Sequence, residues 1–140
     1  MKKMIKRFTA ITTVLLMIAS TAAYAADVRA SAYISSKGGG IIATGSGNML
    51  IEFSVTATGM MDKLGASVIH IYNEDDVLEA TIRYTDPGCS DMMTTSDYSW
   101  DGEVTWEGVS GEGYYAVITF YAKNSSGDDY RSFTTVTVTV

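Results

Sequence analysis

Alternation of apolar with polar residues along most of the chain is the feature that most constrains its fold. In the segment 48–58, every second residue is apolar: Met49, Ile51, Phe53, Val55 and Ala57. Successive side chains of a β-strand point to opposite faces, so a period of two is typical of a strand with one buried face. Apolar residues at helical spacing are almost absent beyond residue 26, and the only proline is Pro87. The sequence therefore predicts an all-β fold.

We expect seven to eight short strands, separated by turns rich in Gly, Asn and Asp. The expected strands cover residues 28–35, 40–44, 48–58, 66–73, 77–85, 98–106, 114–123 and 130–140. The clearest turns are at 45–48, 73–76, 86–88 and 124–127. Short strands at this spacing are typical of an antiparallel β-sandwich.

The same alternation assigns core residues to the later strands. The residues predicted to face the core are Ile69, Ile71, Leu78, Ala80, Ile82, Tyr84, Ala116, Ile118, Phe120, Ala122, Val136, Val138 and Val140. Phe133 breaks the parity of the last strand, so we expect a β-bulge nearby.

Residues 1–25 have the pattern of a secretory signal peptide. Its basic head consists of Lys2, Lys3, Lys6 and Arg7. A largely apolar run at 8–20 follows, and Ala23-Tyr24-Ala25 places small residues around a cleavage site. The apolar run is too short and too rich in Thr to span a bilayer. We therefore predict a secreted protein with no membrane span, made of a signal peptide at 1–25 and a β-sandwich domain at 26–140.

The chain beyond the predicted cleavage site is strongly acidic. Four of the 10 basic residues and none of the 16 acidic residues lie in 1–25, which leaves 6 basic and 16 acidic residues and a formal charge of −10. Binding of nucleic acid relies on clustered Lys and Arg, so a nucleic-acid partner is not expected. The expected partner is an extracellular protein or a glycan.

Candidate catalytic residues are few. Cys89 is the only cysteine and His70 the only histidine, so no intramolecular disulfide can form and a single thiol–imidazole pair is available. No Gly-x-Ser-x-Gly motif supports a serine nucleophile. Glu103 and Glu107 are the best carboxylate pair for glycoside hydrolysis, but both fall on the outward parity of one strand. We expect no catalytic residue.

Two groups of residues have the chemistry of metal ligands. Oxygen ligands for Ca²⁺ cluster in two turns, at Glu74, Asp75, Asp76, Asp128 and Asp129, without the spacing of an EF-hand. Sulfur ligands for Cu(I) occur in the adjacent pairs Met60-Met61 and Met92-Met93, which are better explained as packing at the ends of the sandwich. We therefore expect no metal site and no cofactor.

Aromatic residues offer two interpretations. Trp100 and Trp106 share one parity with Tyr98 and Val104, which predicts that both indoles face the core. Alternatively, exposed rings form a platform that stacks on sugars. The tyrosines that would add to such a platform are Tyr72, Tyr114, Tyr115, Tyr121 and Tyr130.

The stretch from Val109 to Gly127 resembles the end of a fibronectin type III domain of the immunoglobulin-like class. A Gly-bearing turn at 110–113 leads into Tyr114-Tyr115, then an alternating strand at 116–122 and a polar turn ending at Gly127. The resemblance implies an immunoglobulin-like β-sandwich with a tyrosine corner, in which a Tyr hydroxyl bonds back to the preceding loop. Tyr115 takes that place by position, and Tyr114 takes it if strand parity is kept.

The whole chain also resembles short exported proteins of Gram-positive, Clostridia-like bacteria. The residues that carry this likeness are Gly65-Ala66-Ser67 and the Tyr114–Val117 stretch. Together, these patterns favour a secreted, non-enzymatic binding or interaction module. A carbohydrate-binding module that uses exposed aromatics is the alternative, and a small secreted hydrolase is less favoured.

Overall fold

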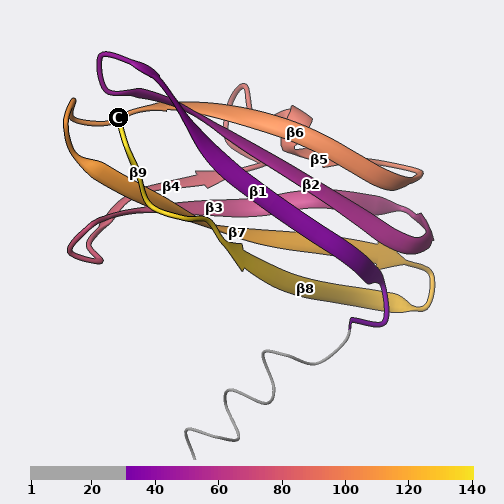
Figure 1. Ribbon diagram of the computed structural model, residues 1–140. Helices are drawn as coiled ribbons and strands as arrows, with labels where there is room; N and C mark the ends of the chain where they lie inside the picture. Colours follow the sequence, from indigo (N-terminus) through magenta and orange to yellow (C-terminus); the bar gives the residue numbers. More distant parts are fainter. Residues whose placement is uncertain (1–30) are drawn as a thin grey trace, which may run out of the picture. The chain divides into compact units, whose positions relative to one another are not determined.

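Nine strands and one short 3-10 helix make up residues 31–140, the part of the chain that the computed structural model describes (Figure 1). In chain order the elements are β1 (Ile34–Gly45), β2 (Asn48–Met61), β3 (Lys63–Asn73), β4 (Leu78–Arg83), η1 (Ser90–Met92), β5 (Met93–Thr94), β6 (Asp97–Glu107), β7 (Gly113–Asn124), β8 (Gly127–Thr134) and β9 (Val138–Thr139). The predicted signal peptide lies outside these residues. None of the helices described is long and apolar enough to cross a membrane.

The strands form two antiparallel sheets that pack face to face. The smaller sheet has the order β1-β2-β6, and the larger has the order β4-β3-β7-β8, with β5 beside β3 and β9 beside β7. β1 packs over β8, β2 over β7 and β6 over β3, so the sheets lie as two layers (Figure 1). The predicted all-β sandwich is confirmed.

Most of the residues that alternation assigned to the core are buried between the sheets. Every apolar residue of the 49–57 series is buried, as are Ile69 and Ile71 of β3 and the series 116–122 of β7. Phe53 of β2 and Phe120 of β7 meet edge to face across the two layers, with ring centroids 6.2 Å apart. This contact ties the central strands of the two sheets together.

Two predicted strands, at 28–35 and 40–44, are wrong as separate elements. Residues 34–45 form the single strand β1, which pairs with β2 through its three consecutive glycines, 38–40. Glycine weakens strand propensity, but main-chain pairing with β2 requires no side chain. The sequence pattern therefore indicated a break where the backbone continues.

The last predicted strand, 130–140, is also interrupted. Residues 135–137 leave the ladder between β8 and β9, so the break in parity near Phe133 takes this form instead of a bulge. Thr135 is buried because its hydroxyl accepts a hydrogen bond from the Ala116 backbone N–H at 3.0 Å. Val136, which was predicted to face the core, is 76% exposed as a result.

Candidate functional site

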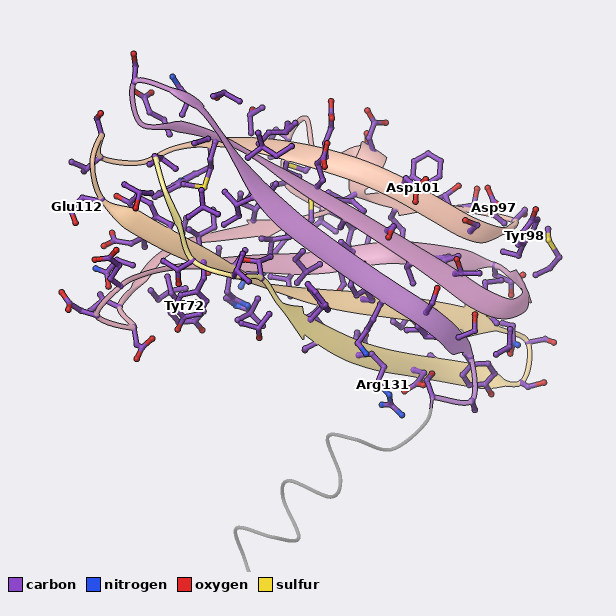
Figure 2. The ribbon with its side chains drawn as sticks, viewed as in Figure 1. Tyr72, Asp97, Tyr98, Asp101, Glu112 and Arg131 are labelled. Atoms are coloured by element: carbon purple, nitrogen blue, oxygen red, sulfur yellow. The ribbon has the colours of Figure 1, made fainter. Side chains whose placement is uncertain are left out.

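The outer face of the larger sheet carries two pairs of tyrosines, which we call the tyrosine face: Tyr72, Tyr115, Tyr121 and Tyr130. Tyr72 on β3 and Tyr115 on β7 are register partners, and their rings stack with centroids 5.2 Å apart and planes 13° apart. Figure 2 shows Tyr72 pointing away from the smaller sheet. Both side chains are partly exposed, so the pair presents aromatic surface to solvent.

The second pair lies farther along the same strand. Tyr121 of β7 and Tyr130 of β8 are register partners with ring centroids 4.6 Å apart. Tyr121 lies six positions beyond Tyr115 in β7, which corresponds to roughly 20 Å along an antiparallel strand. The two pairs therefore occupy opposite ends of one sheet face.

The side chains between the two pairs are small, polar or aliphatic. Register places His70 of β3 beside Val117 of β7, and Val68 beside Thr119, which contacts Ser132 through their hydroxyl groups at 3.4 Å. The His70 ring lies 6.5 Å from that of Tyr72. The tyrosine face therefore has aromatic ends and a mixed centre.

A turn between β3 and β4 fixes the first pair. The Asn73 side-chain oxygen accepts hydrogen bonds from the backbone N–H groups of Asp75 and Val77, at 2.9 and 3.0 Å. Asp76, in a left-handed conformation at φ 61°, accepts a hydrogen bond of 2.7 Å from the Tyr115 hydroxyl. That bond, together with desolvation and the Asp76 charge, raises the pKa of Tyr115 above its usual value. Tyr115 thus remains a neutral, oriented ring at physiological pH.

A similar contact holds the second pair. Partial burial raises the pKa of Tyr121 above its usual value, and the nearby Asp128 carboxylate adds to the shift. The Tyr121 hydroxyl also donates a hydrogen bond of 3.3 Å to Asp128. In both pairs, the ring of β7 is thus oriented by a carboxylate, from Asp76 beyond the β3–β4 turn in the first pair and from Asp128 of β8 in the second.

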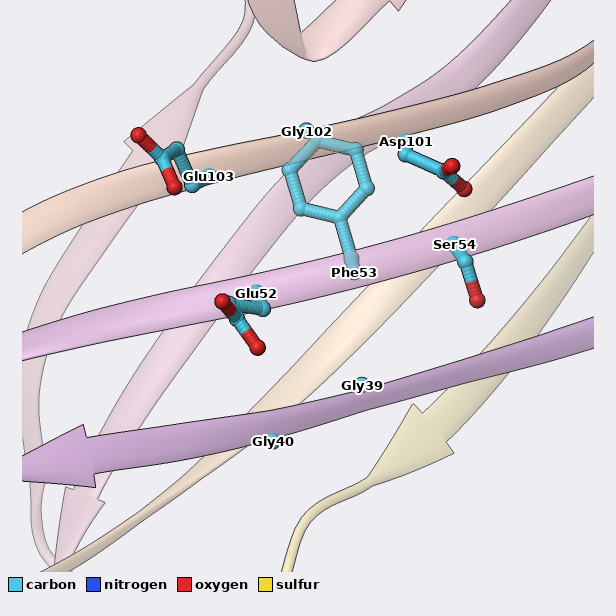
Figure 3. A pocket seen from close by; sticks show the side chains of 8 residues that line it. All are labelled: Gly39, Gly40, Glu52, Phe53, Ser54, Asp101, Gly102 and Glu103. Carbon is cyan, nitrogen blue, oxygen red and sulfur yellow. The ribbon is translucent and has the colours of Figure 1, made fainter.

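A shallow groove of about 610 Å³ crosses the outer face of the smaller sheet (Figure 3). Its lining residues are Gly39, Gly40, Glu52, Phe53, Ser54, Asp101, Gly102 and Glu103. Figure 3 shows Glu52 and Glu103 on neighbouring strands at one end and Ser54 and Asp101 at the other. Glu52 and Glu103 are direct register partners, so two carboxylates lie side by side.

Glycines shape this groove. Gly40 points outward and a Cβ built on it would meet nothing within 4 Å, so the absence of a side chain leaves the β1 side open. Gly39 and Gly102 point inward: a Cβ on Gly39 would lie 2.6 Å from Ile118 Cδ1, and one on Gly102 would lie 2.2 Å from the Phe53 ring. The core packs directly against the backbone at both positions.

The two tryptophans face inward, as predicted, but both are only partly buried. The Trp100 indole N–H donates to the Asp91 carbonyl at 2.8 Å. Trp106 meets Tyr114 edge to face, with ring centroids 5.2 Å apart. Neither indole belongs to the tyrosine face. Tyr98, on the same parity, is 59% exposed near the start of β6.

Tyr114 and Tyr115 have different surroundings. Tyr114 is buried, and its hydroxyl accepts a hydrogen bond of 2.8 Å from the Val109 backbone N–H. Tyr115 lies on the outer face. Strand parity is therefore kept, and Tyr114 is the residue that bonds back to the preceding loop.

The candidate catalytic residues are not brought together. His70 lies on the outer face of the larger sheet, whereas Cys89 precedes η1 and packs against the core from within the sandwich. Glu103 and Glu107 lie on the outer face of β6, where Glu103 faces Glu52 and Glu107 faces Asn48. Sequence reasoning missed Glu52, because the register between β2 and β6 cannot be obtained from either strand alone.

The candidate metal ligands also diverge. Asp128 points outward to Tyr121, whereas Asp129 forms an ion pair of 3.0 Å with Arg131 and accepts a hydrogen bond from Ser31. Within residues 31–140, no group of three or more His, Cys, Asp or Glu side chains has the arrangement of a metal site.

The methionine pairs split in the same way. Met61 and Met92 are buried in the core, Met93 is partly buried, and Met60 is 61% exposed. Met60 and Met61 are adjacent in β2, where successive side chains point to opposite sides, so their sulfurs diverge. Packing in the core explains Met61 and Met92, one from each adjacent pair.

Comparison with protein-family models, with curated proteins and with solved structures gave no match. The fold and the arrangement of side chains therefore carry the functional argument.

Proposed function

We propose that this protein is a secreted, non-enzymatic β-sandwich that acts as an extracellular binding or interaction module. The tyrosine face carries the proposal. It combines partly exposed aromatic rings with hydroxyl groups that are already oriented by Asp76 and Asp128. Oriented aromatic side chains lose little conformational entropy on binding, which makes tyrosine well suited to recognition surfaces.

A binding role agrees with the location of the polar side chains. A nucleophilic or acid–base mechanism needs its groups within hydrogen-bond reach of one another. The thiol and the imidazole lie on different sides of the larger sheet, and the carboxylates of the smaller sheet lie on an open face. Secretion, with cleavage after Ala25, remains part of the proposal on the strength of the sequence pattern in 1–25.

We further propose that the sandwich is of the immunoglobulin-like class, close to fibronectin type III domains. In that class the first, second and fifth strands share one sheet, and the third, sixth and seventh share the other. Among the seven strands of six or more residues, β1, β2 and β6 share the smaller sheet, and β3, β7 and β8 share the larger, which β4 also joins. The bond from the Val109 N–H to Tyr114 supports the same proposal, because it has the form of a tyrosine corner.

Carbohydrate is the second candidate ligand for this surface. The stacked pair Tyr72 and Tyr115 favours it, because apolar faces of sugar rings pack on aromatic side chains and the neighbouring Asp76 carboxylate can accept a hydroxyl hydrogen bond. A protein ligand would use the same rings as anchors. The two candidates are separated by the class of ligand that binds.

A glycan array and an extracellular protein fraction from the source culture, each probed with the cleaved protein, test the proposal. The double variant Tyr72→Ala/Tyr115→Ala is expected to lose binding. Tyr98→Ala is the matched control, because Tyr98 is an exposed tyrosine of the smaller sheet. Equal loss in Tyr98→Ala, or binding unchanged in the double variant, would remove the tyrosine face from the account.

A further inference from the structure

Three of the four long sheet edges carry features that hinder pairing with another strand. β1 has irregular register at both ends, and Lys37 lies on its inward parity beside Val55. β8 turns Asp129 and Arg131 inward, as partners of Ala122 and Phe120. β4 has only six residues. Inward charges, bulges and short length are the usual means by which β-proteins protect their edges.

β6 has 11 residues and no inward charge, and its register with β2 shifts only at the Asp97 end. Its register with β2 is unbroken from Ser99 to Glu107, and residues 97–107 contain no Lys, Arg or Pro. No other strand within residues 31–140 pairs with it on the side opposite β2. η1 covers only the Trp100 end, where the indole donates to the Asp91 carbonyl. The free edge therefore runs from Gly102 to Glu107.

The backbone groups of this edge are directed outward. The Gly108 N–H donates to the Gly47 carbonyl at 2.8 Å, so Gly108 is directed toward β2. Pairs in an antiparallel ladder alternate between hydrogen-bonded and non-hydrogen-bonded. By that alternation, the N–H and C=O groups of Glu103, Thr105 and Glu107 point away from β2.

Apolar side chains lie beside the same edge. Because β6 packs over β3, a strand added next to β6 would lie over β4, the neighbour of β3. Ala80 and Ile82 of β4, the register partners of Ile71 and Ile69, face the core but are only partly buried. Val104 and Trp106 of β6 are also only partly buried. Inward side chains of an added strand would contact this surface.

The outward side chains of β6 set the charge of the partner. Asp101, Glu103 and Glu107 lie in a row along the outer face. Antiparallel pairing with a second copy of β6 would place these carboxylates against one another, which is unfavourable. A strand with Lys or Arg at alternate outward positions would instead be complementary.

We propose that the free edge of β6 binds an extended basic segment of another protein as an added antiparallel strand. The segment has apolar side chains on its inner side, over Ala80 and Ile82 and next to Trp106, and Lys or Arg on its outer side, beside Glu103. Main-chain hydrogen bonds to the Glu103–Glu107 edge hold it in register. This site is distinct from the tyrosine face, so it goes beyond the function proposed above.

A blocked peptide of alternating valine and lysine tests the proposal, with a valine–glutamate peptide of the same length as the charge control. The lysine peptide is expected to bind, with affinity that falls as salt increases, and to slow amide hydrogen exchange at Glu103, Thr105 and Glu107. Equal binding of both peptides, or slowed exchange on β1 or β8 in place of β6, would overturn it. So would a lack of binding by the lysine peptide.

Thr105→Pro removes one outward N–H while the ladder to β2 keeps its bonds. This variant is expected to lose detectable peptide binding, whereas Thr105→Ser retains it. If the proline variant does not fold, as judged by circular dichroism, the exchange pattern of the unmodified protein decides the question. Peptide binding should be unchanged in Tyr72→Ala/Tyr115→Ala, so failure at one site leaves the other untouched.

Discussion

The outer faces of the two sheets differ sharply although the sheets share one core. The face of the larger sheet carries paired tyrosines and His70, whereas that of the smaller sheet carries glycines, hydroxyl side chains and carboxylates. Inward residues of both sheets are similarly apolar. Packing in the core therefore constrains only every second residue of each strand. The outward residues are left to differ, and here they differ by chemical class.

Substitution of glycines in the smaller sheet is expected to have the largest effect on the free energy of unfolding. Gly39→Ala is expected to destabilise the fold by about 1–3 kcal/mol, because the new Cβ would approach Ile118 Cδ1 and the Glu52 carbonyl oxygen within 3 Å. Gly40→Ala, the neighbouring control, meets nothing within 4 Å and should be neutral or stabilise by up to about 1 kcal/mol. Chemical denaturation with an unchanged m-value measures both. Similar effects of the two changes would show that the inner and outer sides of β1 are assigned wrongly.

The paired carboxylates of the smaller sheet give a smaller effect. Glu52→Gln removes one of two like charges that face each other across β2 and β6, so it is expected to stabilise the fold by about 0.2–1 kcal/mol. The gain should shrink as salt is added, because exposed charges are screened. Glu112→Gln, outside both sheets, is the control and should change the free energy of unfolding less. A loss of stability in Glu52→Gln would contradict the repulsion.

Tyrosine titration compares the two tyrosine pairs of the larger sheet and has the smallest expected effect. Asp76→Asn is expected to lower the pKa of Tyr115 toward its usual value, because the bond to Asp76 is the main cause of its elevation. Asp128→Asn should lower the pKa of Tyr121 less, because desolvation is the main cause there. Tyrosinate absorbance, with each tyrosine assigned by a Phe variant, measures both. Equal shifts would contradict the different causes.

The raised pKa of Tyr115 also affects the stability of the fold at high pH. A group whose folded pKa lies above its unfolded pKa stabilises the fold fully below the unfolded value, about pH 10 for tyrosine. That contribution is lost as pH rises through the raised pKa. Tyr115→Phe should therefore flatten the loss of stability above about pH 10.

The parts of the fold that depend on local pattern were predictable from the sequence. Strict alternation predicted β2, β7 and most of the core, because the period-two pattern can be recognised within the sequence of a single strand. Leu78 was predicted to face the core, which is wrong: a register shift next to Ala80 pairs Leu78 with outward-facing Tyr72, and Leu78 is 49% exposed. A register shift depends on the partner strand, which alternation within one strand does not report.

The candidate site was predictable only in part. Outward parity placed Tyr72 and Tyr121 on the surface, but their partners follow from the register of β3, β7 and β8. Register depends on turn geometry and on contacts between distant segments. The Glu52–Glu103 pair has the same origin, since 51 positions separate its members in the sequence. The burial of Thr135 was not predicted, because it accompanies a hydrogen bond from the Ala116 backbone N–H to the Thr135 hydroxyl. These two residues are 19 positions apart in the sequence.

Amide chemical-shift mapping tests directly whether the tyrosine face is the ligand-binding surface. A glycan or protein that binds in the array or fraction experiment is titrated into the isotope-labelled cleaved protein. The account predicts that the largest shifts cluster at His70, Tyr72 and Tyr115, with the groove residues Glu52 and Glu103 little changed. Shifts that cluster at Glu52 and Glu103 and spare the tyrosine face would contradict it.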